Sequence, residues 1–242
     1  MNTGFYKDLD TNFEQALELS ERKFTHFELL DMLKNGNIPQ KQIAALKLDY
    51  LSNIDEAQIL VSNLTGCDGK IREAVALKIN QFLNKNSKYI EFFNQPEIFA
   101  NASIDINGNI CRLVIDSVSI LKTNNDFANI YIKKILNFIE ECFSELDKFV
   151  FRDKKYVINK QLFKLYWALE ALRLFASELD NCILYSILEK TSKEREYTIR
   201  EQTAKIINKL NSSNFDYIKK DLLNDENYYV KNCFVNEINQ TV

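Results

Sequence analysis

Basic residues recur near the starts of successive helical segments, and their side chains are the first candidates for chemistry in this chain. They are Lys41, Arg72, Arg112, Lys160, Arg200 and Lys231, at intervals of roughly 30 to 50 residues. A guanidinium carries five fixed donors on an aliphatic stem, so it can pair with a carboxylate or carbonyl of a neighbouring segment. Acids in the predicted turns offer partners, namely Asp68, Asp105, Glu196 and Asp225. Such pairs would form a ladder between repeats, whereas basic groups facing a groove would bind an anionic ligand.

A second cluster of basic and aromatic residues lies in the segment 151–167, FRDKKYVINKQLFKLYW. Its basic residues are Arg152, Lys154, Lys155, Lys160 and Lys164, and it ends in Tyr166 and Trp167. Aromatic stacking combined with phosphate contacts would suit single-stranded nucleic acid. The plainer interpretation is a solvated linker followed by the start of a long helix. The formal net charge of −3 argues against a dedicated nucleic-acid binder.

Other catalytic or metal-binding equipment is missing from the sequence. No GxxxxGK[ST], GxGxxG, GxSxG or HExxH motif occurs. The one histidine, His26, adjoins Phe24 and Phe27, which favours a packed residue at a helix start over a catalytic base. Glu140 and Glu141 are adjacent on a predicted helix, point in different directions and do not form an acid–base pair. We therefore expect no enzymatic activity and no cofactor.

The five cysteines are dispersed and show no CxxC pairing, so neither a zinc site nor a disulfide framework is expected. Such a set is typical of reduced thiols in a cytoplasmic protein. The N-terminus, MNTGFYKDLD, lacks the basic and apolar regions of a signal peptide, and no apolar run approaches 18 residues. Neither export nor a membrane span is predicted.

The elements that position these residues are predicted to be helices almost throughout. Only five Gly and two Pro occur in 242 residues, which favours long helices over turn-rich β structure. Apolar spacing predicts helices over 12–24, 26–36, 38–52, 54–66, 68–85, 181–191, 195–210, 214–224 and 225–238. Asn12 and Asp55 are predicted as N-caps, and Phe13, Ala16 and Leu17 share one helix face. The segment 94–109 contains Pro96 and Gly108 and is expected to hold a short helix and a loop.

The segment 68–85 is apolar on nearly every side and uses small residues, Ala74 and Ala76 among them. A helix inside a stack touches neighbours on both flanks, so it needs a wider apolar surface than a surface helix does. Short amphipathic helices alternate along the chain with helices that are apolar over more of their surface. This alternation predicts about six helical hairpins.

The second helices resemble those of HEAT-like repeats, whose pattern is D-x-x-[VI]-R-x-x-A-x-x-[LI]. The matching residues are Asp68, Ile71, Arg72, Val75 and Ile79, and less fully Glu196, Ile199, Arg200 and Ala204. The resemblance is strongest over 38–85 and 181–238. It implies an all-α, right-handed α-solenoid forming one domain over 1–242, with 1–24 as a capping helix.

HEAT-like arrays host unrelated functions. We predict a non-catalytic scaffold that binds another protein on its concave face. One alternative is the phycobilin lyase or phycobiliprotein chaperone group, in which Arg72 and Arg112 would pair with bilin propionates beside Tyr166 and Trp167. Another is a DNA-binding protein similar to the alkylation-repair glycosylases, although those carry several tryptophans and a basic cleft. Neither nucleic acid nor a membrane is an expected partner.

Overall fold

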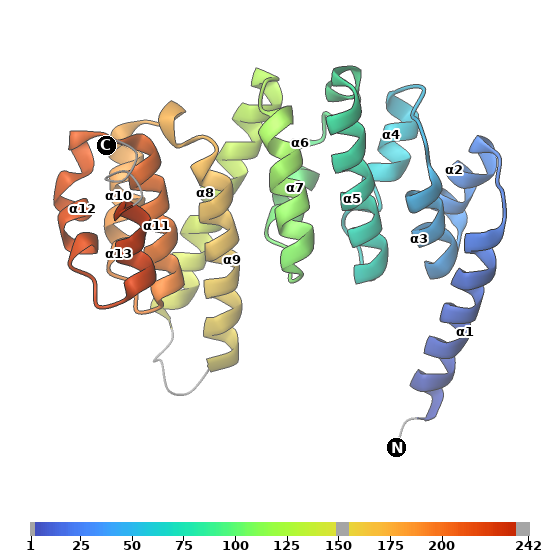
Figure 1. Ribbon diagram of the computed structural model, residues 1–242, viewed down its shortest axis with the longest axis horizontal. Helices are drawn as coiled ribbons and strands as arrows, with labels where there is room; N and C mark the ends of the chain where they lie inside the picture. The colour runs from blue at the N-terminus through green and yellow to red at the C-terminus, as the bar shows by residue number, and fades with distance from the viewer. Residues whose placement is uncertain (1–2, 149–154, 236–242) are drawn as a thin grey trace. The chain divides into compact units, whose positions relative to one another are not determined.

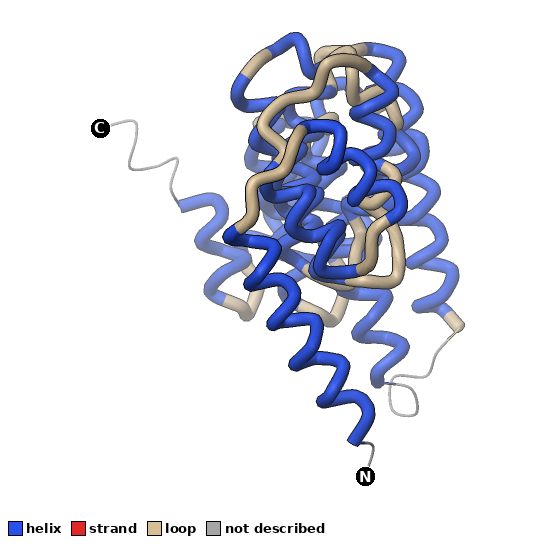
Figure 2. Tube along the Cα trace, turned by 90° about the vertical axis from the view of Figure 1, so that its right-hand side faces the viewer, coloured by secondary structure: helices blue, strands red, loops and turns tan. Residues whose placement is uncertain are grey.

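The computed structural model describes residues 3–148 and 155–235, and this part of the chain consists of helices and the loops that join them (Figures 1 and 2). The prediction of an all-α protein is confirmed, since no strand occurs in the described ranges. The chain forms two compact units, Met1–Tyr131 and Ile132–Val242. Within 3–148 and 155–235, no helix is both long and apolar enough to cross a membrane.

The first unit is built from helices that pack in successive layers. They are α1 (Thr3–Glu21), α2 (His26–Asn35), α3 (Ile38–Lys47), α4 (Ile54–Val61), α5 (Gly69–Lys85), α6 (Pro96–Ser103) and α7 (Gly108–Leu121), followed by the start of α8 (Asn125–Asp147). Helix α3 packs between α1 and α5, and α5 packs between α3 and α7 (Figure 1). Helices α2, α4 and α6 pack against α3, α5 and α7 respectively.

Helix α5 shows why its sequence is apolar on both flanks. Asp68 caps its start by accepting hydrogen bonds from the Lys70 and Ile71 N–H groups at 2.9 and 3.1 Å. Ala74, Val75, Ala76, Ile79, Phe82 and Leu83 are all buried. Because α3 and α7 lie against opposite sides of α5, apolar residues are needed on both. The sequence interpretation of 68–85 as an internal helix is confirmed.

The segment 94–109 contains α6 and a turn, as predicted, although Pro96 begins the helix instead of interrupting it. Aromatic rings fill the core beneath it. Phe93 meets Phe99, Phe99 meets Phe127, and Phe127 stacks on Tyr131, with centroid separations of 6.5, 5.6 and 5.8 Å. The buried Tyr131 hydroxyl lies 2.7 Å from the Ser103 hydroxyl, which satisfies both groups.

The second unit contains the end of α8 and the helices α9 (Lys155–Arg173), α10 (Asn181–Ser192), α11 (Tyr197–Leu210), α12 (Asp216–Leu223) and α13 (Tyr228–Val235). Helix α11 lies at its centre and contacts α9, α10, α12 and α13. Thr203 of α11 donates a hydrogen bond to Thr191 of α10 at 2.7 Å, and both side chains are buried. Helix α11 therefore occupies a central place in its unit, like α5 in the first.

Several predicted helix limits are wrong. Asn12 is not a cap, because α1 already begins at Thr3, and Phe13 and Leu17 are exposed. Asp55 is not a cap either, since Asn53 caps α4 by accepting from the Glu56 N–H at 2.9 Å. Helix α3 ends at Lys47, and the chain continues in non-helical form with Leu48 and Leu51 buried. Apolar spacing alone could not separate those buried loop residues from a further turn of helix.

Candidate functional site

The predicted ladder residues share a position in their helices. Lys41, Arg72, Arg200 and Lys231 are each the fourth residue of α3, α5, α11 and α13. At this position a side chain can reach back over the turn that precedes its own helix. It can also reach across to the turn that precedes the next helix of the row.

Arg72 joins two consecutive turns of the first unit. Its Nε donates to Asp105 Oδ2 at 2.7 Å, and its Nη2 donates to Asp105 Oδ1 at 3.1 Å. The third guanidinium nitrogen, Nη1, donates to the Gly66 carbonyl at 2.6 Å. The Arg72 and Asp105 side chains are only 9% and 11% exposed. Bidentate geometry and burial make this a strong contact between successive hairpins.

Arg200 repeats this arrangement in the second unit. Its Nε and Nη2 donate to Asp225 Oδ2 and Oδ1 at 2.6 and 3.0 Å. Its Nη1 donates to the carbonyls of Glu194 and Arg195 at 2.8 and 2.9 Å. The prediction that these two guanidiniums contact turn carboxylates or carbonyls is confirmed. Of the four candidate acids, Asp68 and Glu196 instead occupy N-cap positions.

The two acids sit in turns of the same form. Asp105 Oδ1 accepts from the Asn107 N–H, and Asp225 Oδ1 accepts from the Asn227 N–H, both at 2.8 Å. Each asparagine then accepts from the N–H two residues further on, at 2.9 Å. The D-x-N sequence therefore fixes the carboxylate and begins the following helix at once. We call the combination of such an arginine with the D-x-N turn that binds it the arginine clamp.

The basic residues of α3 and α13 make weaker contacts. Lys41 Nζ donates to Asn63 Oδ1 at 3.0 Å, in the turn before α5. Asn63 also donates to the carbonyls of Leu33 and Ile59, so it ties that turn to α2 and α4. Lys231 is half-buried, and its charge is one of several influences that lower the pKa of Asp225.

Arg112 does not occupy the ladder position. It is the fifth residue of α7, it is exposed, and it donates to Asn109 Oδ1 at 3.1 Å. The fourth residue is Cys111, a buried thiol that donates to the Asp105 carbonyl at 3.1 Å. Burial raises the pKa of Cys111 to about 12. The sequence alignment is one residue out here, so Arg112 does not share the helix position of Arg72.

Tyr166 and Trp167, the aromatic candidates of α9, pack against other aromatic rings of the same helix. Trp167 makes edge-on contacts with Tyr166 and Phe163, with centroid separations of 5.2 and 6.3 Å. Tyr166 and Trp167 are half-buried, and Lys160 is exposed. Arg152 and Lys154 lie outside the described residues. Lys164 is half-buried. The basic and aromatic surface over 151–167 stays a prediction.

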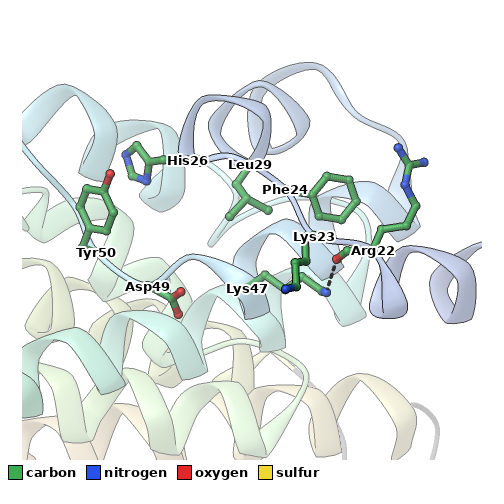
Figure 3. A pocket seen from close by; sticks show the side chains of 8 residues that line it. All are labelled: Arg22, Lys23, Phe24, His26, Leu29, Lys47, Asp49 and Tyr50. Carbon is green, nitrogen blue, oxygen red and sulfur yellow. Dashed lines mark hydrogen bonds between the residues drawn. The ribbon is translucent and has the colours of Figure 1, made fainter.

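A pocket of about 520 Å³ in the first unit is lined by residues outside the predicted ladder and outside the segment 151–167. We call it the basic pocket, and it is lined by Arg22, Lys23, Phe24, His26, Leu29, Lys47, Asp49 and Tyr50 (Figure 3). These residues come from the link between α1 and α2, the first turns of α2, the end of α3 and the loop after it. Figure 3 shows His26 and Tyr50 on one side, Phe24 on the other and Leu29 between them. Asp49, Lys47 and Lys23 lie along its lower edge in that view.

Lys47 is held at the base of this pocket by the end of α1. Its Nζ donates to the Ser20 and Arg22 carbonyls at 2.6 and 2.7 Å. These carbonyls lie at and just beyond the C-terminal end of α1, where carbonyls lack partners within the helix. The Lys47 ammonium and the Arg22 guanidinium both lie by the Phe24 ring, 5.8 and 5.3 Å from its centroid. Phe24 thus forms cation–π contacts with two cations at the pocket.

His26 and Tyr50 form the opposite wall. Their rings stack at 4.1 Å with an interplanar angle of 8°. His26 Nε2 lies 2.9 Å from Glu56 Oε2, which also accepts from the Ser52 N–H at 2.7 Å. Burial alone would raise the pKa of the Glu56 carboxyl, but these hydrogen bonds outweigh burial and lower it. His26 is a packed residue at a helix start, as predicted.

The sequence did carry a signal for this pocket, the run Arg22-Lys23-Phe24 in the link between two helices. That run cannot be connected with Lys47 and Tyr50 without knowing how α3 folds back against α1. Within the described residues, no group of three or more His, Cys, Asp or Glu side chains could hold a metal ion. No family model matches the chain, and no curated protein matches it either.

Proposed function

We propose that the chain is an array of about six HEAT-like hairpins, arranged as a right-handed α-solenoid, and that it serves as a non-catalytic protein-binding scaffold. The observation that carries this proposal is the arginine clamp. It occurs in both units with the same donors, the same turn form and the same helix position. A repeated contact between consecutive hairpins is what a stacked array needs to fix its register.

The clamp also bears on what Arg72 and Arg200 do. Their guanidiniums are engaged by carboxylates and carbonyls of the chain, so they are not free to bind a ligand. This removes one of the two arginines on which the bilin alternative depends. The scaffold proposal needs only side chains presented by the second helix of each hairpin.

The ninth residues of α3, α5 and α7 present such side chains. They are Leu46, Leu77 and Asp116, and each is exposed or half-buried. Because they share a helix position, they form a row across three neighbouring helices of the first unit. We propose this row as part of the concave binding face.

Site-specific photo-crosslinking tests the proposal. A benzophenone amino acid is placed at Leu46, Leu77 or Asp116, and matched variants carry it at Asp31, Gln58 or Glu97 on α2, α4 and α6, all exposed. After irradiation in a lysate of the native source, the row should crosslink one common protein that the matched positions miss. Equal labelling from both sets, or no protein adduct from the row, would defeat the scaffold proposal.

A further inference from the structure

The basic pocket combines some apolar walls with a cationic edge. Phe24, Leu29 and Tyr50 give it apolar walls, and Tyr50 remains 48% exposed although it stacks on His26. A volume of about 520 Å³ lies within the range of sites that bury a small molecule or a large side chain. These walls therefore suit a ligand with an apolar part.

The charge at the edge is opposite in sign to that of the chain. Arg22, Lys23 and Lys47 face one acid, Asp49, in a protein of net charge −3. Asp49 is itself within the electrostatic reach of Lys78, and its carbonyl accepts from Lys85 Nζ at 3.4 Å. The acid is thus flanked by further cations and does not neutralise the pocket.

Two of the three cations are available to a ligand. Arg22 and Lys23 are exposed, and neither takes part in a salt bridge between described residues, although the charge of Arg22 is felt by the exposed Glu28 carboxylate. Lys47 uses two of its three donor hydrogens on carbonyls and keeps one. The hollow between α8 and α10 in the second unit differs, because its Lys190 pairs with Asp147 at 2.9 Å and Glu140 lies in its wall.

From this arrangement we infer that the basic pocket binds an acidic peptide segment of a partner protein, with one aromatic or aliphatic side chain of that segment seated between Phe24 and Tyr50. Carboxylates beside that side chain meet Arg22, Lys23 and Lys47. The inference rests on the proposed scaffold function and names the chemistry of its partner. Three cations at one pocket suit a few carboxylates, whereas nucleic-acid binders draw their affinity from many phosphate contacts.

The test measures binding of fluorescent peptides to the full chain by anisotropy. The first probe has a central phenylalanine flanked by aspartate and glutamate. A second replaces the phenylalanine with glycine, a third replaces the acids with lysine, and a fourth is a single-stranded oligonucleotide. The acidic phenylalanine peptide should bind most tightly, and loss of the phenylalanine should weaken binding about tenfold, as expected for burial of one aromatic side chain.

The double variant Arg22→Glu/Lys23→Glu should weaken binding of the acidic peptide at least about tenfold. Both side chains are exposed, so helicity and thermal midpoint should be retained. Its control is Lys70→Glu/Lys220→Glu, which makes the same change in net charge at exposed positions of α5 and α12 and should bind as the unmodified chain does.

Tighter binding of the lysine peptide or of the oligonucleotide, or equal binding by the double variant, would overturn the inference. The two proposals can fail separately. If the row of α3, α5 and α7 crosslinks a partner but the acidic peptide does not bind, the pocket inference fails and the scaffold stands. If the peptide binds as described but no partner is crosslinked, the pocket binds acidic peptides and the scaffold function fails.

Discussion

Arg200 of α11 and Asp225, in the turn between α12 and α13, are joined by two parallel hydrogen bonds of 2.6 and 3.0 Å. A matching pair of bonds joins Arg72 of α5 to Asp105, which lies in the turn between α6 and α7. Because the two pairs lie in different units, each clamp forms locally and does not need the other. The two clamps can therefore be tested one at a time.

The first prediction concerns the loss of one clamp. Arg72→Ala should lower the free energy of unfolding by about 3 kcal/mol, because Asp105 is left buried without its cation. Arg72→Lys should recover only part of this, since an ammonium cannot make the two parallel bonds. Urea denaturation followed by circular dichroism measures both. A loss below about 0.5 kcal/mol, the usual effect of a surface substitution, would contradict the structural role.

Asp225 gives the second prediction, a dependence on pH. Burial favours the protonated acid, but hydrogen bonds from Arg200 and the Asn227 N–H outweigh burial and lower the pKa of Asp225 from its usual 3.8. The unfolded chain therefore binds this proton first as the pH falls. The stability it contributes is present above about pH 4 and is lost as the pH drops through the folded pKa.

Urea denaturation at neutral pH and near pH 3 tests this with Asp225→Asn. The unmodified chain should lose more stability between the two conditions than the variant does, because the variant has no proton to take up at this site. Equal losses would show that Asp225 does not contribute to the acid sensitivity.

A third prediction concerns the packing of α5. Ala76→Arg should destabilise the chain severely, by more than about 3 kcal/mol, because it places an unpaired charge at a buried position between helices. Gln81→Arg is the matched control, since Gln81 lies on the same helix and is exposed. If the two variants share one thermal midpoint, α5 is not an internal helix.

Lys78 supplies the fourth prediction, in which stability and binding change in opposite directions. Burial lowers the pKa of Lys78, and the nearby Asp49 only partly offsets this effect. The charged ammonium of Lys78 is therefore less favourable in the folded chain than in the unfolded chain. Lys78→Met should raise the free energy of unfolding by up to about 1 kcal/mol. It should also weaken binding of the acidic peptide, because Asp49 then lacks one of the cations that offset its charge. A variant that is less stable, or that binds more tightly, would contradict this account.

The sequence was most informative where one short pattern determined both a helix start and its packing. Asp68, Arg72 and the apolar residues of 68–85 predicted an internal helix and an arginine pair, and both are present. It misled where register mattered, since Arg112 and Cys111 differ by one residue and only the start of α7 at Gly108 decides between them. The basic pocket was out of reach, because Lys47 and Tyr50 join Arg22 and Lys23 only through the tertiary fold.

The D-x-N turn has a consequence for insertions and deletions in related genes. Asp105 and Asp225 each lie two residues before an N-cap asparagine and bind its N–H, so one added or removed residue there would move the carboxylate away from its arginine. The link between α5 and α6 contains no residue of a clamp, so its length is not fixed by one. Length differences among homologous chains should therefore gather in links of that kind and avoid the intervals 105–107 and 225–227, which an alignment of such chains would reveal as gap-free positions.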